Sequence, residues 1–200
     1  MSISRRTSRT FVPILAGLLA SLALLPAVAQ AQHRSGAASA ARYGSTALVL
    51  DPTAANALSS LGVSPGLIAP AYQSGGALRF PITNPVTSAL LTGTIKHAGG
   101  ISLTKGATEV DLTNFWINLR TRQLSAVVNG GARVPILNLS FQGTRVSFRY
   151  GRRVVGPVTA SLTSAAAGAL NNAFGVTAFT EGLVLGKATV RYKLFAGYGW

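Results

Sequence analysis

Residues 92–141 read TGTIKHAGGISLTKGATEVDLTNFWINLRTRQLSAVVNGGARVPILNLSF, and this stretch decides the fold class. Apolar and polar residues alternate through most of it, which places successive side chains on opposite faces of β-strands. Asn129-Gly130 joins two of these runs, and Asn-Gly is a strong hairpin signal because both central positions of the turn need positive φ. We therefore expect a continuous antiparallel meander of half-buried strands.

One strand of the meander changes face partway along. Val110 and Leu112 occupy even positions, whereas Phe115 and Ile117 occupy odd positions, so the apolar side chains move to the other face of the strand. A strand that changes face usually contains one extra residue. The pattern therefore predicts a β-bulge near Asn114.

Similar Ala-rich segments flank the meander. In the first, Asp51 is a favoured N-cap, Pro52 suits the first helical position, and Gly62 ends the helix. The second, over residues 164–174, is closed by Gly175. We interpret the two segments as an internal repeat, with similar composition as the alternative. The predicted fold is mainly β, an antiparallel β-sandwich and meander with two short capped helices, one closing each end.

The N-terminal region has the pattern of an export signal. Residues 1–10 carry three arginines and no acid, residues 11–28 are almost entirely apolar, and small residues follow at a site of A-x-A type. This combination predicts a signal peptide over residues 1–31, with an uncleaved membrane anchor as the alternative. Residues 32–44 would then form a flexible leader and residues 45–200 a single domain of an exported protein.

The chain is strongly basic and contains no cysteine. It has 18 Lys and Arg against 4 Asp and Glu, a net charge of +14. Such an excess favours anionic partners, although it also keeps an exported protein soluble. The absence of cysteine excludes disulfides, thiolate catalysis, zinc fingers and iron–sulfur clusters.

No catalytic constellation stands out. The two histidines are His33, in the leader, and His97, in the meander, and neither accompanies a nucleophile signature. Glu109 and Asp111 share a strand face, which is more typical of a solvated edge than of an acid/base pair. We expect a non-enzymatic protein without a metal site.

His97 is the candidate ligand-binding residue. A lone histidine at the end of a strand, beside Gly99 and Gly100, could bind haem iron with a tyrosine as the other ligand. The alternative is an exposed turn histidine.

A family resemblance supports this candidate. Residues 93–103 (GTIKHAGGISL) and 110–115 (VDLTNF) resemble the core of the HtaA-type domain, a secreted or surface-displayed β-domain that bacteria use in haem uptake. The resemblance covers most of residues 92–176 and implies an exported β-domain with haem as a possible cofactor. The family's opening segment, which supplies the axial tyrosine, has no clear counterpart here. Tyr43 and Tyr72 are the positional candidates for that ligand.

A second candidate site is basic. Arg145, Arg149, Arg152 and Arg153 are close together in the sequence and suggest an anion-binding patch. Because the basic residues are spread through turns, we expect an anionic cell-envelope surface or a small ligand as partner, and no nucleic acid.

The C-terminus suggests a different class of protein. Apolar or aromatic residues occupy every second position, namely Val190, Tyr192, Leu194, Ala196, Tyr198 and Trp200. This resembles the last strand of an outer-membrane β-barrel, with Arg191 and Lys193 facing the lumen. The favoured interpretation is an exported, non-enzymatic binding or surface-interaction module, with haem as its candidate ligand. A small outer-membrane barrel or an envelope structural protein is the alternative.

Overall fold

The structure is a computed structural model that describes residues 43–84 and 93–193. The predicted signal peptide, all but the last two residues of the predicted leader, and the C-terminal positions from Leu194 onward lie outside the described residues.

The described residues form one twelve-stranded antiparallel sheet and two helices. In chain order these are β1 (Gly44–Leu50), α2 (Pro52–Ser60), β2 (Ser64–Ile68), β3 (Tyr72–Ser74), β4 (Ala77–Pro81), β5 (Thr94–Lys96), β6 (Gly100–Lys105), β7 (Thr108–Asn118), β8 (Gln123–Val128), β9 (Arg133–Ser140), β10 (Arg145–Arg149), β11 (Arg152–Leu162), α3 (Ser164–Phe174) and β12 (Val184–Tyr192). The predicted mainly β, antiparallel fold with two capped helices is confirmed.

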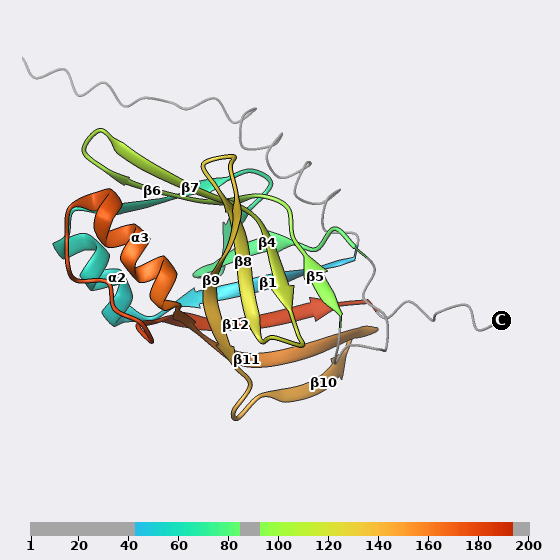
Figure 1. Cartoon of the computed structure of the whole chain (residues 1–200). Helices are drawn as coiled ribbons and strands as arrows, with labels where there is room; N and C mark the ends of the chain where they lie inside the picture. Colours follow the sequence, from blue (N-terminus) through green and yellow to red (C-terminus); the bar gives the residue numbers. More distant parts are fainter. Residues whose placement is uncertain (1–42, 85–92, 194–200) are drawn as a thin grey trace, which may run out of the picture.

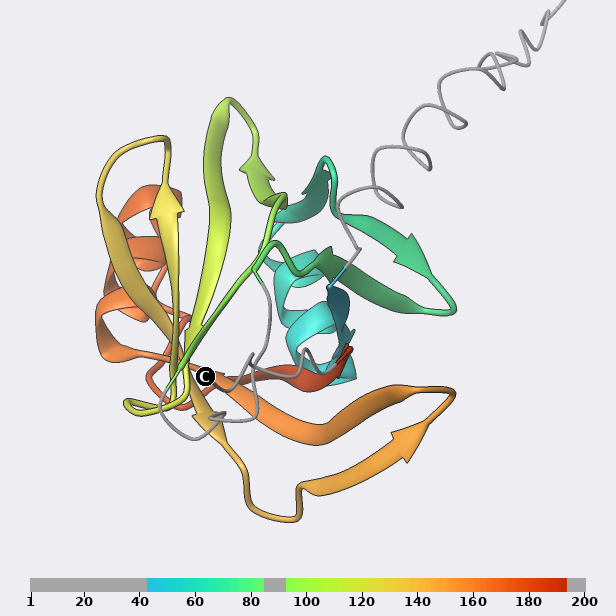
Figure 2. The same cartoon turned by 90° about the vertical axis from the view of Figure 1, so that its right-hand side faces the viewer.

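The sheet curls into a nearly closed barrel (Figures 1 and 2). Its strand order is β2-β6-β7-β8-β9-β11-β12-β1-β4-β3, and β5 pairs with β7. The chain just beyond β4 meets the chain just beyond β5, where Ile82 and His97 form a bridge. Two backbone hydrogen bonds support this closure, from Thr83 N to Lys96 O at 2.9 Å and from Ala98 N to Pro81 O at 3.0 Å. The layers that pack on each other are thus parts of a single rolled sheet.

Alternate side chains of the longer strands point into the barrel and form its core. On β11 the buried positions are Val158, Ala160 and Leu162. On β12, Val190 and Tyr192 are likewise buried while Arg191 between them is exposed. In this last described strand the apolar side chains point inward and Arg191 points outward. A terminal strand in an outer membrane was expected to have the opposite arrangement.

The predicted bulge in β7 is confirmed. The register of β7 against β8 shifts between Thr113 and Trp116, and Asn114 has φ of 52°. The guanidinium of Arg133 holds this irregular segment to the neighbouring strand. Its Nη1 donates to Asn114 O at 2.7 Å and to Ser125 O at 3.3 Å.

Both helices begin at a side-chain cap, of which Asp51 was predicted and Thr163 was not. The Asp51 carboxylate accepts a hydrogen bond from Thr53 N at 2.9 Å, and the Thr163 hydroxyl accepts one from Ala166 N at 3.1 Å. Gly175 ends α3 in the left-handed conformation, as expected. Of the helices in the described part of the chain, none has the length and apolarity to cross a membrane.

The predicted placement of the helices at opposite ends is wrong. Figure 1 shows α2 and α3 at the same end of the barrel. The reason lies in the strands that precede them, because β1 and β11 both end there, on either side of β12. Each helix therefore starts from the same rim and covers the same opening.

Candidate ligand-binding cavity

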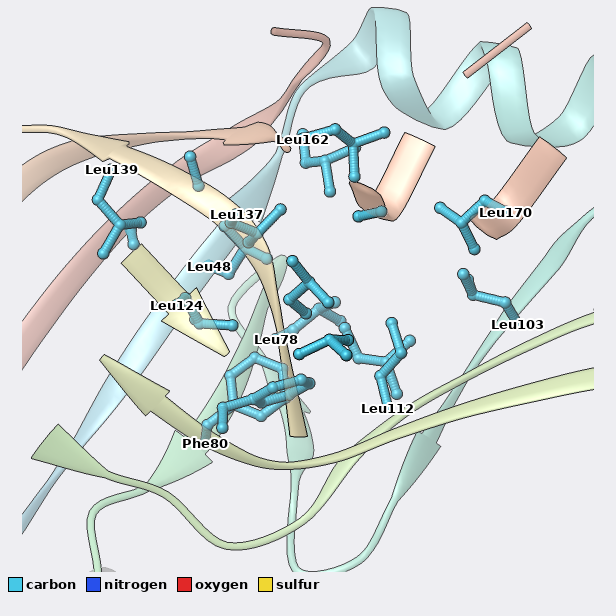
Figure 3. Close-up of a pocket in the computed structure, with 18 of the residues that line it drawn as sticks. Leu48, Leu78, Phe80, Leu103, Leu112, Leu124, Leu137, Leu139, Leu162 and Leu170 are labelled. Carbon is cyan, nitrogen blue, oxygen red and sulfur yellow. The ribbon is translucent and has the colours of Figure 1, made fainter. Parts of the chain in front are cut away.

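The interior of the barrel is incompletely filled. A cavity of about 350 Å³ lies between the curled sheet and the two helices. Figure 3 shows leucine side chains from several strands and from α3 pointing into this space. They include Leu48, Leu78, Leu103, Leu112, Leu137 and Leu170, with Phe80 beside them.

The cavity wall is almost entirely apolar. Among the described residues that line it, only Thr46, His97 and Asn129 have polar side chains, and none is charged. Water held in such a space would lack the two to four polar partners that a buried water needs. The wall is thus suited to an apolar occupant.

Small side chains at inward positions leave the space open. Ala160 and Ala188 line the cavity from β11 and β12, at positions where neighbouring inward residues such as Val158 and Leu162 are larger. The helices contribute alanines as well, including Ala54 of α2 and Ala166 of α3. The cavity therefore follows from the residues present, because alanine is too short to meet the opposite wall.

The cavity reaches the surface along α3. Ala165, Ala169 and Ala173 line the cavity and are exposed to solvent. Their spacing of four residues places them on one face of the helix. Exposed Pro65 and Asn129 line the same cavity from the sheet side. We call these five residues the mouth.

His97 is a buried residue of the cavity wall, and the alternative of an exposed turn histidine is wrong. Its side chain is 3 % exposed. The chain reaches this position because His97 N donates to Phe115 O at 2.8 Å, which continues the pairing of β5 with β7. The expected turn does follow at Gly99, but it lies against Ile68 and Ala71 instead of facing solvent.

Both ring nitrogens of His97 have hydrogen-bond partners. Nδ1 lies 3.1 Å from Phe115 O, and Nε2 lies 2.7 Å from the hydroxyl oxygen of Thr46. A carbonyl oxygen can only accept, so Nδ1 carries the proton and the Thr46 hydroxyl donates to Nε2. Burial lowers the pKa of His97 to about 4, although the bond to Phe115 opposes this shift. The imidazole is therefore neutral at pH 7.

The two candidate tyrosines do not join His97 in the cavity wall. Tyr43 is half-buried just before β1 and packs against the outside of the core cluster. Tyr72 is half-buried on β3, opposite Arg79 of β4. Neither is among the described residues that line the cavity.

The four candidate anion-binding arginines lie together on the hairpin of β10 and β11. Arg149 pairs with Arg152 next to the turn, and Arg153 pairs with Phe148. Burial raises the pKa of the nearby Tyr192 hydroxyl, while the charge of Arg153 opposes that rise. The part of β11 that pairs with β10, up to Gly156, does not line the cavity, and neither does β10, so the two candidate sites are separate.

A metal site has no support within residues 43–84 and 93–193. No three His, Cys, Asp or Glu side chains in these ranges gather closely enough to hold an ion.

Solved structures show where this fold occurs. The C-terminal domain of HtaA from Corynebacterium glutamicum superposes with a TM-score of 0.53 at 18 % identity, covering 75 % of this chain and 96 % of that domain. The fold is HtaA-like. A domain-swapped dimer of a variant of that domain gives a TM-score of 0.48 at 19 % identity, covering 72 % of this chain and 91 % of that chain. No protein-family model matches the sequence, and no curated protein matches it.

Haem, the ligand suggested for His97 by the sequence, can be compared with this interior. The imidazole of His97 is neutral, as an iron ligand must be, but its Nε2 lone pair already accepts from Thr46. The described wall also lacks a charged side chain to pair with the two carboxylates of haem. As described, the cavity fits a wholly apolar ligand better than it fits haem.

Residues beyond the sequence-predicted candidates define this site. Sequence reasoning identified His97 but missed Thr46, the mouth alanines and the inward alanines of β11 and β12. The available signal was an Ala-rich helix beside strands with alanine at core positions, which indicates a core with too little volume.

Proposed function

We propose that this chain is an exported, non-enzymatic binding module that takes up a small apolar ligand in the cavity of its barrel. The cavity carries this proposal, since it combines a volume of about 350 Å³ with an apolar wall and an exposed mouth. Ligand pockets of proteins are typically of this size and are lined mainly by apolar residues.

The energy of an empty cavity favours an occupant. Apolar wall that no ligand covers stays open to solvent through the mouth, at a cost of about 25 cal/mol per Å² of exposed apolar surface. A ligand that fills the space and releases its own apolar surface from water would offset much of this cost.

A fluorescence titration tests the proposal. Residues 32–200, the chain that remains after the predicted cleavage, are titrated with N-phenyl-1-naphthylamine, which brightens in apolar surroundings. We expect saturable binding with one probe per chain. Ala169→Leu narrows the mouth and should weaken binding about tenfold, roughly the effect of 1.4 kcal/mol.

Asn172→Leu is the matched control, because Asn172 is an exposed residue of the same helix that does not line the cavity. It should leave probe binding unchanged. Equal weakening by both substitutions, or the absence of saturable binding, would contradict the proposal.

Haem is the second candidate ligand, favoured by the place of His97 in the cavity wall. Haemin is titrated in the same way and followed by its Soret absorbance. A saturable shifted band that weakens in His97→Ala would support iron ligation by the imidazole. Probe binding without a shifted Soret band would restrict the function to apolar ligands.

A further inference from the structure

The hairpin of β10 and β11 projects from the barrel, as Figure 2 shows. Within the described residues β10 pairs with β11 alone, so its other edge has no strand beside it. The turn at the tip is formed by Tyr150 and Gly151, both with positive φ.

The two faces of the hairpin differ, since one carries Val146 and Phe148 with a single arginine and the other carries three arginines. Directly opposite residues of an antiparallel pair share a face. Val146 is opposite Val155, and Phe148 is opposite Arg153. The other face carries Arg145, Arg149 and Arg152, since Arg149 is opposite Arg152 and Arg145 lies four residues before Arg149.

The apolar side chains of this hairpin are largely in solvent. Val146 is 61 % exposed, Phe148 66 % and Tyr150 98 %. Val146 and Phe148 lie on the face that continues the inside of the barrel, because Val155 is opposite core residue Val190. Within residues 43–84 and 93–193 no second layer covers that face at the hairpin, and the apolar surface of both side chains is exposed.

The charge of the hairpin selects the type of surface that it would contact. Residues 145–156 contain four arginines and no acidic residue. A second copy of the chain would bring the same four charges against them, which disfavours self-association. An anionic bilayer attracts the arginines, and its interfacial region accepts exposed aromatic side chains.

We propose that the β10–β11 hairpin docks this domain on an anionic lipid bilayer, with Phe148 and Tyr150 entering the interfacial region and the arginines contacting lipid phosphates. This docking goes beyond ligand binding and uses none of the residues that line the cavity. It would bring the domain to the surface where apolar molecules are concentrated.

Vesicle flotation tests this proposal. Residues 32–200 are mixed with vesicles of phosphatidylcholine containing about one third phosphatidylglycerol, or with phosphatidylcholine alone. We expect binding to the anionic vesicles only, weakening as salt rises through the physiological range. Arg149→Gln with Arg152→Gln should lower the partition coefficient about 30-fold, since each arginine near an anionic surface contributes about fivefold.

Two further variants refine the arginine test. Arg120→Gln with Arg122→Gln removes the same charge from the exposed turn between β7 and β8 and should lower binding less than threefold. Arg149→Lys with Arg152→Lys keeps the charge and should restore most of the binding.

The apolar contribution is tested separately. Phe148→Ser with Tyr150→Ser should lower binding about tenfold, whereas Val49→Ser, at a 54 % exposed position of β1, should have no effect. Arg152 is half-buried and the other substituted side chains are exposed, and none of them lines the cavity, so unchanged probe binding and nearly unchanged thermal unfolding are expected for every variant.

Three results would overturn the proposal. Equal losses of vesicle binding in the two arginine-to-glutamine variants would assign the binding to net charge. Full vesicle binding by the Phe148→Ser, Tyr150→Ser variant would exclude interfacial insertion. Arginine-dependent binding to heparin, without vesicle binding, would assign the hairpin to soluble polyanions.

Discussion

The chemistry of the cavity at the scale of single residues depends on His97. Its neutral imidazole links two strands of the barrel, because Nε2 accepts from Thr46 on β1 and Nδ1 donates to the Phe115 carbonyl of β7. The described lining includes no charged side chain, so only the Phe115 carbonyl favours an imidazolium, and this is too little to offset burial. The residue therefore supports the fold in its unprotonated form.

Acid should destabilise the protein through this residue. Burial lowers the pKa of His97 from 6.5 to about 4, so between these values the unfolded chain binds the proton and the folded chain does not. The stabilisation is complete above about pH 6.5 and is lost as the pH falls towards 4, by about 3 kcal/mol in total. Denaturant unfolding of the wild type at several pH values measures this loss.

His97→Gln is the control for that experiment. It keeps a polar side chain at the position but cannot titrate, and the acidic residues contribute equally in both proteins. The difference in unfolding free energy between wild type and variant should therefore narrow as the pH falls from 6.5 to 4. A difference that stays constant over this range would show that the imidazole is not held neutral.

The sequence predicts the presence of His97 at a strand end but not its burial. Alternation and the Gly99-Gly100 pair predict a turn. The burial arises because the chain beyond β4, about fifteen residues earlier, pairs at this point. A local pattern does not contain this long-range pairing, and Thr46 could not be recognised as its partner for the same reason.

The repeated strand-and-helix units show how local signals act at the scale of elements. Asp51 and Thr163 occupy equivalent caps, and both helices form where the sequence predicts them. Their surroundings differ, however. Thr163 is 7 % exposed, and its hydroxyl also donates to Pro135 O at 3.0 Å, so it joins α3 to β9.

This difference predicts unequal costs for removing the two caps. Asp51→Ala loses one exposed cap and should lower the unfolding free energy by about 1 kcal/mol. Thr163→Ala also leaves the carbonyl of Pro135 without its donor, and should cost about 2 to 3 kcal/mol. Chemical denaturation of both variants at one pH compares them, and equal costs would mean that the bond to Pro135 contributes nothing.

The bulge in β7 was also predictable, because the change from even to odd apolar positions along the strand is a local signal. The side chain that holds the bulge in place was not predictable. Arg133, which donates to the carbonyl of Asn114, also stacks on the ring of Trp116 at 3.9 Å, with Lys96 at 4.5 Å from the same ring. These contacts join β5, β7 and β9, and they appear only once the strands are adjacent.

At the scale of the whole molecule, the cavity could not be predicted from composition. The chain is long enough to fill a core, and the alternation predicts an apolar face for the strands. The void arises because Ala160 of β11 and Ala188 of β12, which both face inward, line the same space as the alanines of α3. These alanines share one space because the sheet closes and both helices cover the same rim.

This arrangement makes a prediction in which stability and binding change in opposite directions. Ala160→Leu adds three carbon atoms to an inward position that borders the cavity, and burying them should raise the unfolding free energy by about 2 kcal/mol. The same atoms occupy space that a ligand would use, so the affinity for N-phenyl-1-naphthylamine should fall at least tenfold. Denaturant unfolding and the fluorescence titration measure the two changes on one protein.

Ala126→Leu is the matched control. Ala126 is fully buried on β8 but does not line the cavity, so the larger side chain has no space to enter and should cost about 1 to 3 kcal/mol. If the unfolding free energy rises in Ala160→Leu and falls in Ala126→Leu, the space beside Ala160 is open and available to a ligand. Destabilisation of similar size at both positions would mean that the interior is already filled, and the binding function proposed for the barrel would then have no site.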